Sequence, residues 1–189
     1  MDHYKESWEL IKGDLVPWIV LLFVFSMVNS FTGGLGMFLL PNLFRAVRNA
    51  LAEQRSPEIG ELFEFDAITD DVVTVILQNI ANMIGMMVCC VGIFATMVLF
   101  FFAPMMAADG DLAPMDIMKG SMAFAKANFG EIFMFILMGA LVNFAGAMLC
   151  GIGTFVTIPV TFVASWRFYE MHKEAILTAA DAEGLPRKA

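Results

Sequence analysis

The charged residues of this chain are separated by three long stretches that contain no charge. These stretches cover residues 15–44, 72–108 and 132–166. A helix needs about 20 apolar residues to cross a bilayer, so each stretch has room for two helices joined by a short turn. Because backbone polar groups in lipid must be satisfied within the chain, each stretch is predicted to be a helical hairpin.

Six transmembrane segments follow from this division, near residues 16–32, 36–48, 72–89, 93–108, 132–149 and 152–168. Segments of about 17 residues are about 25 Å long, slightly less than the hydrocarbon core of a bilayer. Arg45 shortens the apolar run of the second segment. The predicted class is an all-α integral membrane protein with six transmembrane helices in three hairpins.

The ends of the three predicted hairpins share a sequence pattern. NMIGMMVCCVG, which starts at Asn82, aligns with NFAGAMLCGIG, which starts at Asn143. The four identical positions are Asn82/Asn143, Gly85/Gly146, Cys89/Cys150 and Gly92/Gly153. SMVNSFTGGLG aligns less closely and places Asn29, Gly33 and Gly36 at the positions of Gly146, Cys150 and Gly153. The chain is therefore predicted to repeat one unit three times.

Each repeat is predicted to begin with an amphipathic helix in the membrane interface. Residues 7–14, 60–68 and 114–129 combine apolar side chains with carboxylates or lysines, as interfacial helices do. We expect a single membrane domain over 1–189, with repeat units at about 5–55, 58–110 and 112–172. Residues 173–189 would form a cytoplasmic C-terminal tail.

Composition and charge support this interpretation and set the orientation. The chain is 59% hydrophobic and 16% charged, whereas soluble domains are about 25% charged. All eleven Lys and Arg residues lie at the open ends of the predicted hairpins and none in their turns. Both termini and the two long loops are therefore predicted to be cytoplasmic. The net charge of −8 gives no basic patch for nucleic acid.

Several polar side chains lie within the predicted membrane segments, without an ionisable group beside them. The candidates are Asn29, Gln78, Asn79, Asn82 and Asn143. One interpretation is a hydrogen-bonded layer that holds helices together. The other is the lining of a polar path or of a lipid headgroup pocket. We favour the structural interpretation, because amides commonly pair between membrane helices.

Small residues and prolines complete the predicted hairpins. Gly85 with Cys89, and Gly146 with Cys150, form small-xxx-small pairs that permit close helix packing. The glycines predicted to form the turns are Gly33, Gly36, Gly92 and Gly153. Pro41, Pro104 and Pro159 are predicted to kink the second helix of each hairpin.

The sequence shows no pattern typical of a metal, cofactor or catalytic site. Cys89, Cys90 and Cys150 do not have the spacing of metal ligands, and both histidines lie outside the uncharged stretches. We expect no metal, no cofactor and no catalytic residues, and therefore no enzymatic activity. Sixteen methionines are interpreted as adaptable packing.

Four sequence segments show a family resemblance: LPNLFRAVR from Leu40, GELFEFD from Gly60, APMMAADG from Ala103 and SMAFAKANFG from Ser121. Over residues 5–170 the chain resembles a family of bacterial and archaeal six-helix membrane proteins of unknown function. That family is similar to the membrane domain fused to some glycerophosphodiester phosphodiesterases. The resemblance implies a multi-pass protein of the bacterial inner membrane, and it transfers no catalytic residue.

Two functions fit these features. The first is a non-enzymatic membrane scaffold that forms homo-oligomers or docks a membrane-protein partner, and that organises lipid or a larger complex. The second is a transporter or channel subunit, in which the intramembrane asparagines line a path.

Overall fold

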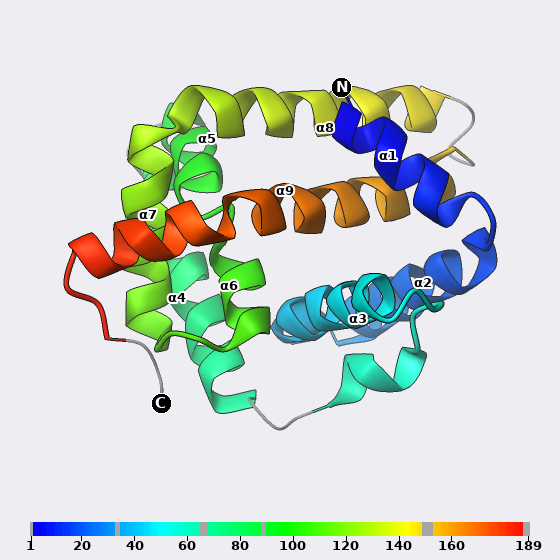
Figure 1. The fold of residues 1–189 in the computed structure, drawn as a ribbon, viewed down its shortest axis with the longest axis horizontal. Helices are drawn as coiled ribbons and strands as arrows, with labels where there is room; N and C mark the ends of the chain where they lie inside the picture. Colours follow the sequence, from blue (N-terminus) through cyan, green and yellow to red (C-terminus); the bar gives the residue numbers. More distant parts are fainter. Residues whose placement is uncertain (1, 33–34, 65–67, 88–89, 149–152, 187–189) are drawn as a thin grey trace. The chain divides into compact units, whose positions relative to one another are not determined.

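The computed structural model describes residues 2–32, 35–64, 68–87, 90–148 and 153–186 (Figure 1). Within these ranges the chain forms α-helices and short 3-10 helices joined by turns, and it contains no β-strand. The predicted all-α class is therefore confirmed.

Contacts between residues divide the chain into two compact units. Unit 1 consists of residues 1–64 and 135–170, and unit 2 of residues 65–134 and 171–189. Two long helices, α8 (Phe129–Met148) and α9 (Thr154–Ala182), contribute residues to both units. These units do not coincide with the three predicted repeats, and the repeats stay a prediction from the sequence.

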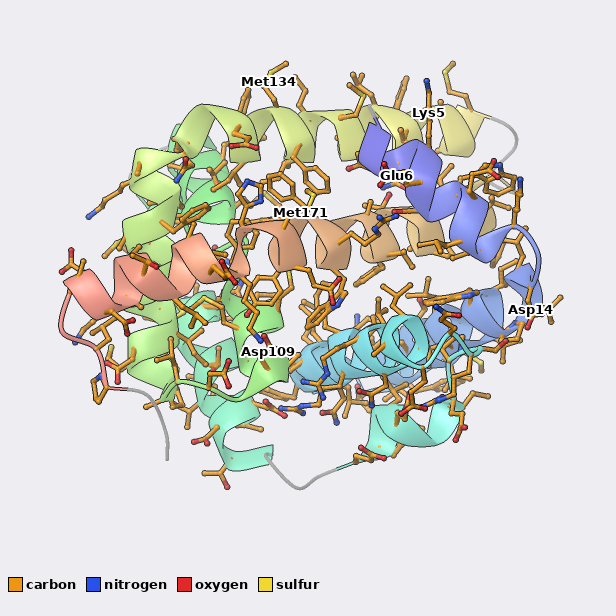
Figure 2. All side chains as sticks on the ribbon, in the orientation of Figure 1. Lys5, Glu6, Asp14, Asp109, Met134 and Met171 are labelled. Atoms are coloured by element: carbon orange, nitrogen blue, oxygen red, sulfur yellow. The ribbon has the colours of Figure 1, made fainter. Side chains whose placement is uncertain are left out.

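Unit 1 begins with two helices that meet at a sharp bend. α1 (Asp2–Ile11) and α2 (Leu15–Phe31) differ in direction by 105°. α1 buries Tyr4, Ser7 and Ile11 on one face, while Lys5 and Glu6 on the same helix are exposed (Figure 2). A short helix with one buried face therefore precedes a long apolar helix, but it covers Asp2–Ile11 and not the predicted segment 7–14.

The chain after α2 differs from the single helix predicted over 36–48. A 3-10 helix, η1 (Leu35–Leu39), precedes α3 (Leu40–Ala52), and a second 3-10 helix, η2 (Ile59–Phe63), follows. Pro41 lies in the first turn of α3 and not within a kinked helix. Proline lacks an N–H, and a first turn does not need that donor, so a helix starts readily beside it.

The core of unit 1 joins α2, α3, η2 and part of α9. The buried cluster contains Leu21, Leu22, Leu39, Leu43, Ala46 and Leu62. Phe44 of α3 lies 5.3 Å from Phe162 of α9, measured between ring centroids. Phe135 of α8 stacks on Phe168 of α9 at 4.3 Å, so aromatic contacts connect the helices of this unit.

Unit 2 contains α4 (Ile68–Met87), α5 (Cys90–Leu99), α6 (Ala103–Asp109) and α7 (Pro114–Ala127). The helix predicted over 93–108 is divided, because α5 ends at Leu99 and α6 begins at Ala103. Pro104 lies in the first turn of α6, so here too the proline follows a break and does not kink a continuous helix. Pro159 does lie inside a helix, α9.

The described helices differ in whether they are long and apolar enough to cross a bilayer. By length and composition, α8 is apolar enough to cross a bilayer, and α1 with α2 meets the same criterion if the bent pair counts as one span. The six predicted spans are not confirmed by this measure. The second helices of the hairpins are short or broken, or they continue into charged sequence.

Glycines bring backbones into direct contact at two of the predicted hairpin turns. A Cβ atom on Gly153 would lie 2.5 Å from the Gly146 carbonyl oxygen, and one on Gly36 would overlap the backbone of Asn29. These two pairs occupy aligned positions of the first and third repeats. The same close contact therefore closes both hairpins.

Replacing Gly153 by alanine is expected to lower the melting temperature of the detergent-purified protein. The added methyl group forces the Gly146 backbone away, at a cost of about 1–3 kcal/mol. Gly130→Ala is the matched control, because a Cβ there meets no atom within 4 Å. Equal melting temperatures for the two variants would contradict the close contact.

Candidate functional site

The predicted intramembrane amide Asn143 joins the two helices of the third hairpin. Its Nδ2 atom donates to Thr161 Oγ1 at 3.1 Å, and that hydroxyl donates to the Thr157 carbonyl oxygen at 2.8 Å. Ser165 Oγ donates to the Thr161 carbonyl oxygen at 2.8 Å, one turn further along α9. Asn143 is thus part of a polar ladder that runs along one side of α9.

Gln78 satisfies backbone atoms at the break between α5 and α6. Its Nε2 atom lies 3.4 Å from the Phe100 carbonyl oxygen, and Ser121 Oγ of α7 donates to the Leu99 carbonyl oxygen at 2.9 Å. A helix break leaves carbonyl oxygens without intrahelical partners, which is costly in an apolar environment. Gln78 and Ser121 therefore explain how an interrupted helix is tolerated in unit 2.

The predicted layer of Asn29, Asn82 and Asn143 is divided between the two units. Asn29 and Asn143 belong to unit 1 and Asn82 to unit 2. In all three the side-chain carbonyl oxygen is buried and has no hydrogen-bond partner among the described residues. Asn79 differs, since it is exposed and its Nδ2 atom donates, within the described part of the chain, to the Val75 carbonyl oxygen of its own helix at 2.8 Å. The three buried oxygens are free acceptors for a water, a donor or a cation.

The remaining predicted turn and packing residues are only partly described. Gly33, Cys89 and Cys150 lie outside the described residues. Gly85 and Gly92 have helical backbones, in α4 and α5. Gly36, Gly146 and Gly153 form the close contacts reported above.

Tyr4 provides a contact between α1 and α8 that the sequence did not indicate. Its hydroxyl donates to the Phe135 carbonyl oxygen at 3.2 Å, and its ring stacks on Phe135 at 5.3 Å. A Cβ on Gly139 would lie 2.5 Å from this hydroxyl, so the glycine leaves room for it. Burial raises the pKa of Tyr4 to about 12, and the hydroxyl stays protonated as a donor.

A polar network along one face of α3 was also missed from the sequence. Asn42 Nδ2 donates to the carbonyl oxygens of Leu62 at 3.1 Å and Glu64 at 2.7 Å. Asn49 Nδ2 donates to the buried Glu61 carboxylate at 3.1 Å. Asn42 and Asn49 are seven residues apart, about two helical turns, and this spacing could have indicated that both lie on one face of a helix. This network holds η2 against α3.

Arg55, just beyond the C-terminal end of α3, is surrounded by carboxylates. Its guanidinium pairs with Glu53 at 2.5 Å, with Glu58 at 3.4 Å and with Glu61. Hydrogen bonds to Glu53 and Glu61 raise the pKa of Arg55 above its ordinary value. The three carboxylates outnumber the single cation, so the group has a net negative charge.

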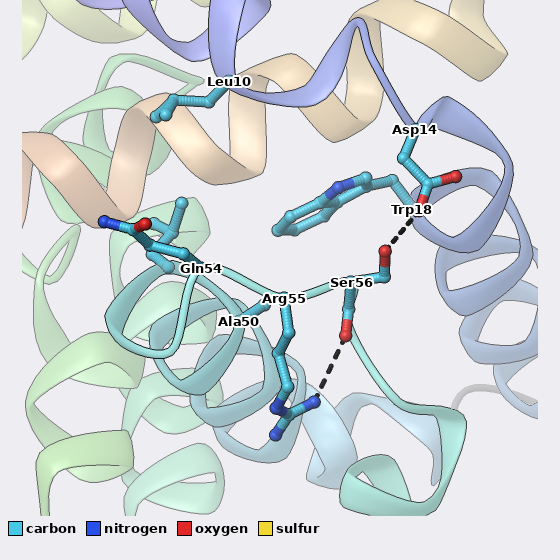
Figure 3. Close-up of a pocket in the computed structure, with 8 residues that line it drawn as sticks. Leu10, Asp14, Trp18, Ala50, Gln54, Arg55 and Ser56 are labelled. Carbon is cyan, nitrogen blue, oxygen red and sulfur yellow. Dashed lines mark hydrogen bonds between the residues drawn. The ribbon is translucent and has the colours of Figure 1, made fainter.

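A pocket of about 490 Å³ opens beside this group, where α1 turns into α2 (Figure 3). Its lining residues are Leu10, Asp14, Trp18, Ala50, Leu51, Gln54, Arg55 and Ser56. Figure 3 shows the Trp18 indole in the middle of these residues, with the Arg55 guanidinium directed away from it. Ser56 Oγ donates to the Asp14 carboxylate.

Unit 2 has its own ionic cluster at the start of the C-terminal part of α9. Lys173 Nζ lies 2.5 Å from Asp109 and 3.5 Å from Asp111, and His172 Nε2 lies 3.3 Å from Glu131. Burial lowers the pKa of Lys173, but the hydrogen bonds and charges of Asp109 and Asp111 outweigh it and leave the pKa raised. The cluster ties α9 to the ends of α6 and α8.

Metal binding was sought among the described residues. No group of three or more His, Cys, Asp or Glu side chains there has a geometry that holds a metal ion.

Two apolar grooves accompany the polar pocket in unit 1. One, of about 300 Å³, lies between α2 and α9 and is lined by residues including Leu22, Phe23 and Phe155. The other, of about 470 Å³, lies on the α8–α9 hairpin over Ala145, Gly146, Gly153 and Thr157. Both are lined mainly by apolar side chains.

Large apolar side chains are exposed along several helices. On α8 they are Met134, Leu137, Leu141, Phe144 and Met148, which recur every three or four residues. On α2 they are Val16, Val20, Phe23, Met27 and Phe31. Exposed apolar positions at helical spacing form continuous faces, and such faces normally contact protein or lipid.

Comparisons with known proteins give no relative for this chain: no family model, no curated protein and no solved structure matches it. The class that the fold defines is an all-helical protein with exposed apolar helix faces and at least one helix long enough to span a bilayer.

Replacing Asn143 by leucine is expected to lower the melting temperature, because the hydrogen bond between α8 and α9 is lost. The expected cost is about 0.6–2 kcal/mol, as for other interhelical hydrogen bonds in membranes. Asn79→Leu is the control, since Asn79 bonds only within its own helix. A thermal shift assay in detergent that ranks the two variants alike would contradict the role of Asn143.

Proposed function

We propose that this protein is a multi-pass protein of the bacterial inner membrane, and that it acts as a non-enzymatic scaffold. It self-associates or docks a membrane-protein partner, and it organises lipid around itself. The observation that carries the proposal is the set of exposed apolar faces on α2, on α8 and on α4, where the exposed side chains are Val73, Ile76, Ile80, Met83 and Ile84.

These faces fit a lipid environment better than water. Phe31 is 83% exposed, Met148 73%, Phe144 64% and Met83 62%. Each Å² of apolar surface moved out of water is worth about 25 cal/mol, so these side chains strongly favour an apolar surrounding. No charged residue occurs from Leu15 to Phe44 or from Ile132 to Trp166, the ranges that contain the faces of α2 and most of α8.

The interrupted helices are compatible with six spans. Irregular backbone is tolerated at membrane depth where protein buries it. Phe102 and the residues of α6 up to Ala108 are buried, and Gln78 and Ser121 satisfy carbonyl oxygens at the break. The break between α5 and α6 is therefore compatible with a membrane-spanning segment. The resemblance to six-helix membrane proteins of unknown function favours the same topology.

The scaffold role is supported by surfaces that suit packing. The groove over Gly146 and Gly153 is shallow and made of small residues, which allow another helix to approach closely. The groove between α2 and α9 has a volume of about 300 Å³ and a mainly apolar lining, which suits part of an acyl chain. Oligomers and retained lipid are both expected from these surfaces.

A transporter or channel subunit is the second candidate. It is favoured by the buried acceptor oxygens of Asn29, Asn82 and Asn143, which have no partner among the described residues. Such oxygens would bind a dehydrated cation or a hydrogen-bond donor on its way through the protein. The scaffold is preferred, because Asn143 already bridges α8 and α9 through its Nδ2 atom.

The proposal is tested by extracting the protein from native membranes with a nanodisc-forming polymer and analysing the particles by native mass spectrometry. We expect oligomers or co-purified membrane proteins together with bound phospholipid. A lone monomer that retains no lipid would contradict the scaffold. Release of the protein into the supernatant by a carbonate wash would contradict the membrane location itself.

A further inference from the structure

The pocket at the bend between α1 and α2 has the chemistry of a cation site. Asp14 and Trp18 line it from one side, and Ala50 and Leu51 from the end of α3. Arg55, the one cation in its lining, is paired with Glu53, Glu58 and Glu61. These three glutamates do not line the pocket, and their pairing with Arg55 offsets its positive charge. Asp14 is then the carboxylate in the lining whose negative charge is not offset by an ion pair among those found in the described residues.

The Asp14 carboxylate is directed to this pocket and does not cap the helix that follows. Asp14 occupies the position before α2, yet its side chain makes no capping hydrogen bond. It accepts a hydrogen bond from Ser56 Oγ across the pocket instead (Figure 3). A carboxylate has about four acceptor sites, so one hydroxyl leaves capacity for an ammonium group.

Two further features favour positive charge in the ligand. The C-terminal end of α3 lies in the lining, and a helix C-terminus has a partial negative charge. The Trp18 side chain lies in the lining with 6% of its surface exposed, and tryptophan is the best of the aromatic side chains at binding cations.

The position of the pocket along the chain points to lipid as the source of that ammonium group. Asp14 is the last charged residue before the first uncharged stretch, so in the proposed topology the pocket lies at headgroup level. Leu22, one helical turn beyond Trp18, lines the apolar groove between α2 and α9. A headgroup in the pocket would thus have an acyl-chain groove on the same helix.

We propose that this pocket binds the ammonium group of a phospholipid headgroup, with phosphatidylethanolamine as the matching class. Asp14 pairs with the ammonium group, which contacts the part of Trp18 that lines the pocket. The apolar side chains of Leu10 and Leu51 contact the glycerol region. This inference rests on the proposed membrane location only for the source of the ammonium group.

The test uses the full chain purified in detergent and native mass spectrometry with short-chain phospholipids. We expect dihexanoyl phosphatidylethanolamine to bind about five- to tenfold more tightly than dihexanoyl phosphatidylglycerol, as one ion pair with a cation–π contact would give. Asp14→Asn should abolish this preference, and Ser56→Ala should keep it because the carboxylate remains. Glu9→Gln is the matched control, since Glu9 carries the same charge on α1 but does not line the pocket.

The competing sources give different results. Equal binding of the two lipids, or an unchanged preference in Asp14→Asn, would overturn the site. A lysine-rich peptide that binds while free ethanolamine fails to compete with the lipid would overturn it in favour of a protein partner. Failure of the proposed membrane location alone would give a different result. The carbonate wash would release the protein, but the protein would still bind free ethanolamine, and Asp14→Asn would abolish that binding.

Discussion

Direct contact between helix backbones at the hairpin ends sets the spacing of the neighbouring helices. Gly153 meets the Gly146 carbonyl group, and Gly36 meets the backbone of Asn29, with no room for a Cβ atom in either place. At this short separation Asn143 reaches Thr161 from the facing helix. Further along α8, Gly139 leaves space for the Tyr4 hydroxyl. The polar and aromatic contacts of unit 1 thus depend on positions where side chains are absent.

Polar side chains within the apolar sequence serve mainly to satisfy the backbone and to join helices. Gln78 and Ser121 take up carbonyl oxygens at the break between α5 and α6. Asn42 does the same for the carbonyl oxygens of Leu62 and Glu64, which fixes η2 on α3. Most of the few polar side chains in these regions already form such hydrogen bonds, which favours a structural role for them. Among the described residues, the exceptions are the buried oxygens of Asn29, Asn82 and Asn143 and the buried hydroxyls of Thr74 and Thr157.

The sequence predicted the helical class, the amphipathic helix at the start of the third repeat and the close contact at Gly146 and Gly153, because these depend on local pattern. The segment 114–129 is a case in point, since Pro114 in the first turn and apolar spacing define α7 by themselves. The other two predicted amphipathic helices were misplaced, since α1 covers Asp2–Ile11 and the described residues 60–64 contain the 3-10 helix η2 in place of an α-helix. The sequence did not predict that the segments 36–48 and 93–108 are broken, because Pro41 and Pro104 are equally compatible with a kink and with a new helix start. The pocket at Asp14 and Trp18 could not be predicted from the sequence for another reason. Its two walls are about 40 residues apart in the chain and meet only through tertiary packing.

The central claim is that the three hairpins cross the membrane with their turns on the outer side. It is tested most directly by cysteine labelling in intact cells, in a variant that lacks Cys89, Cys90 and Cys150. The account predicts that Gly34→Cys reacts with a membrane-impermeant maleimide added outside, whereas Glu58→Cys reacts only after the membrane is permeabilised. Labelling of Gly34→Cys only after permeabilisation would show that the first hairpin does not cross, and would contradict the account.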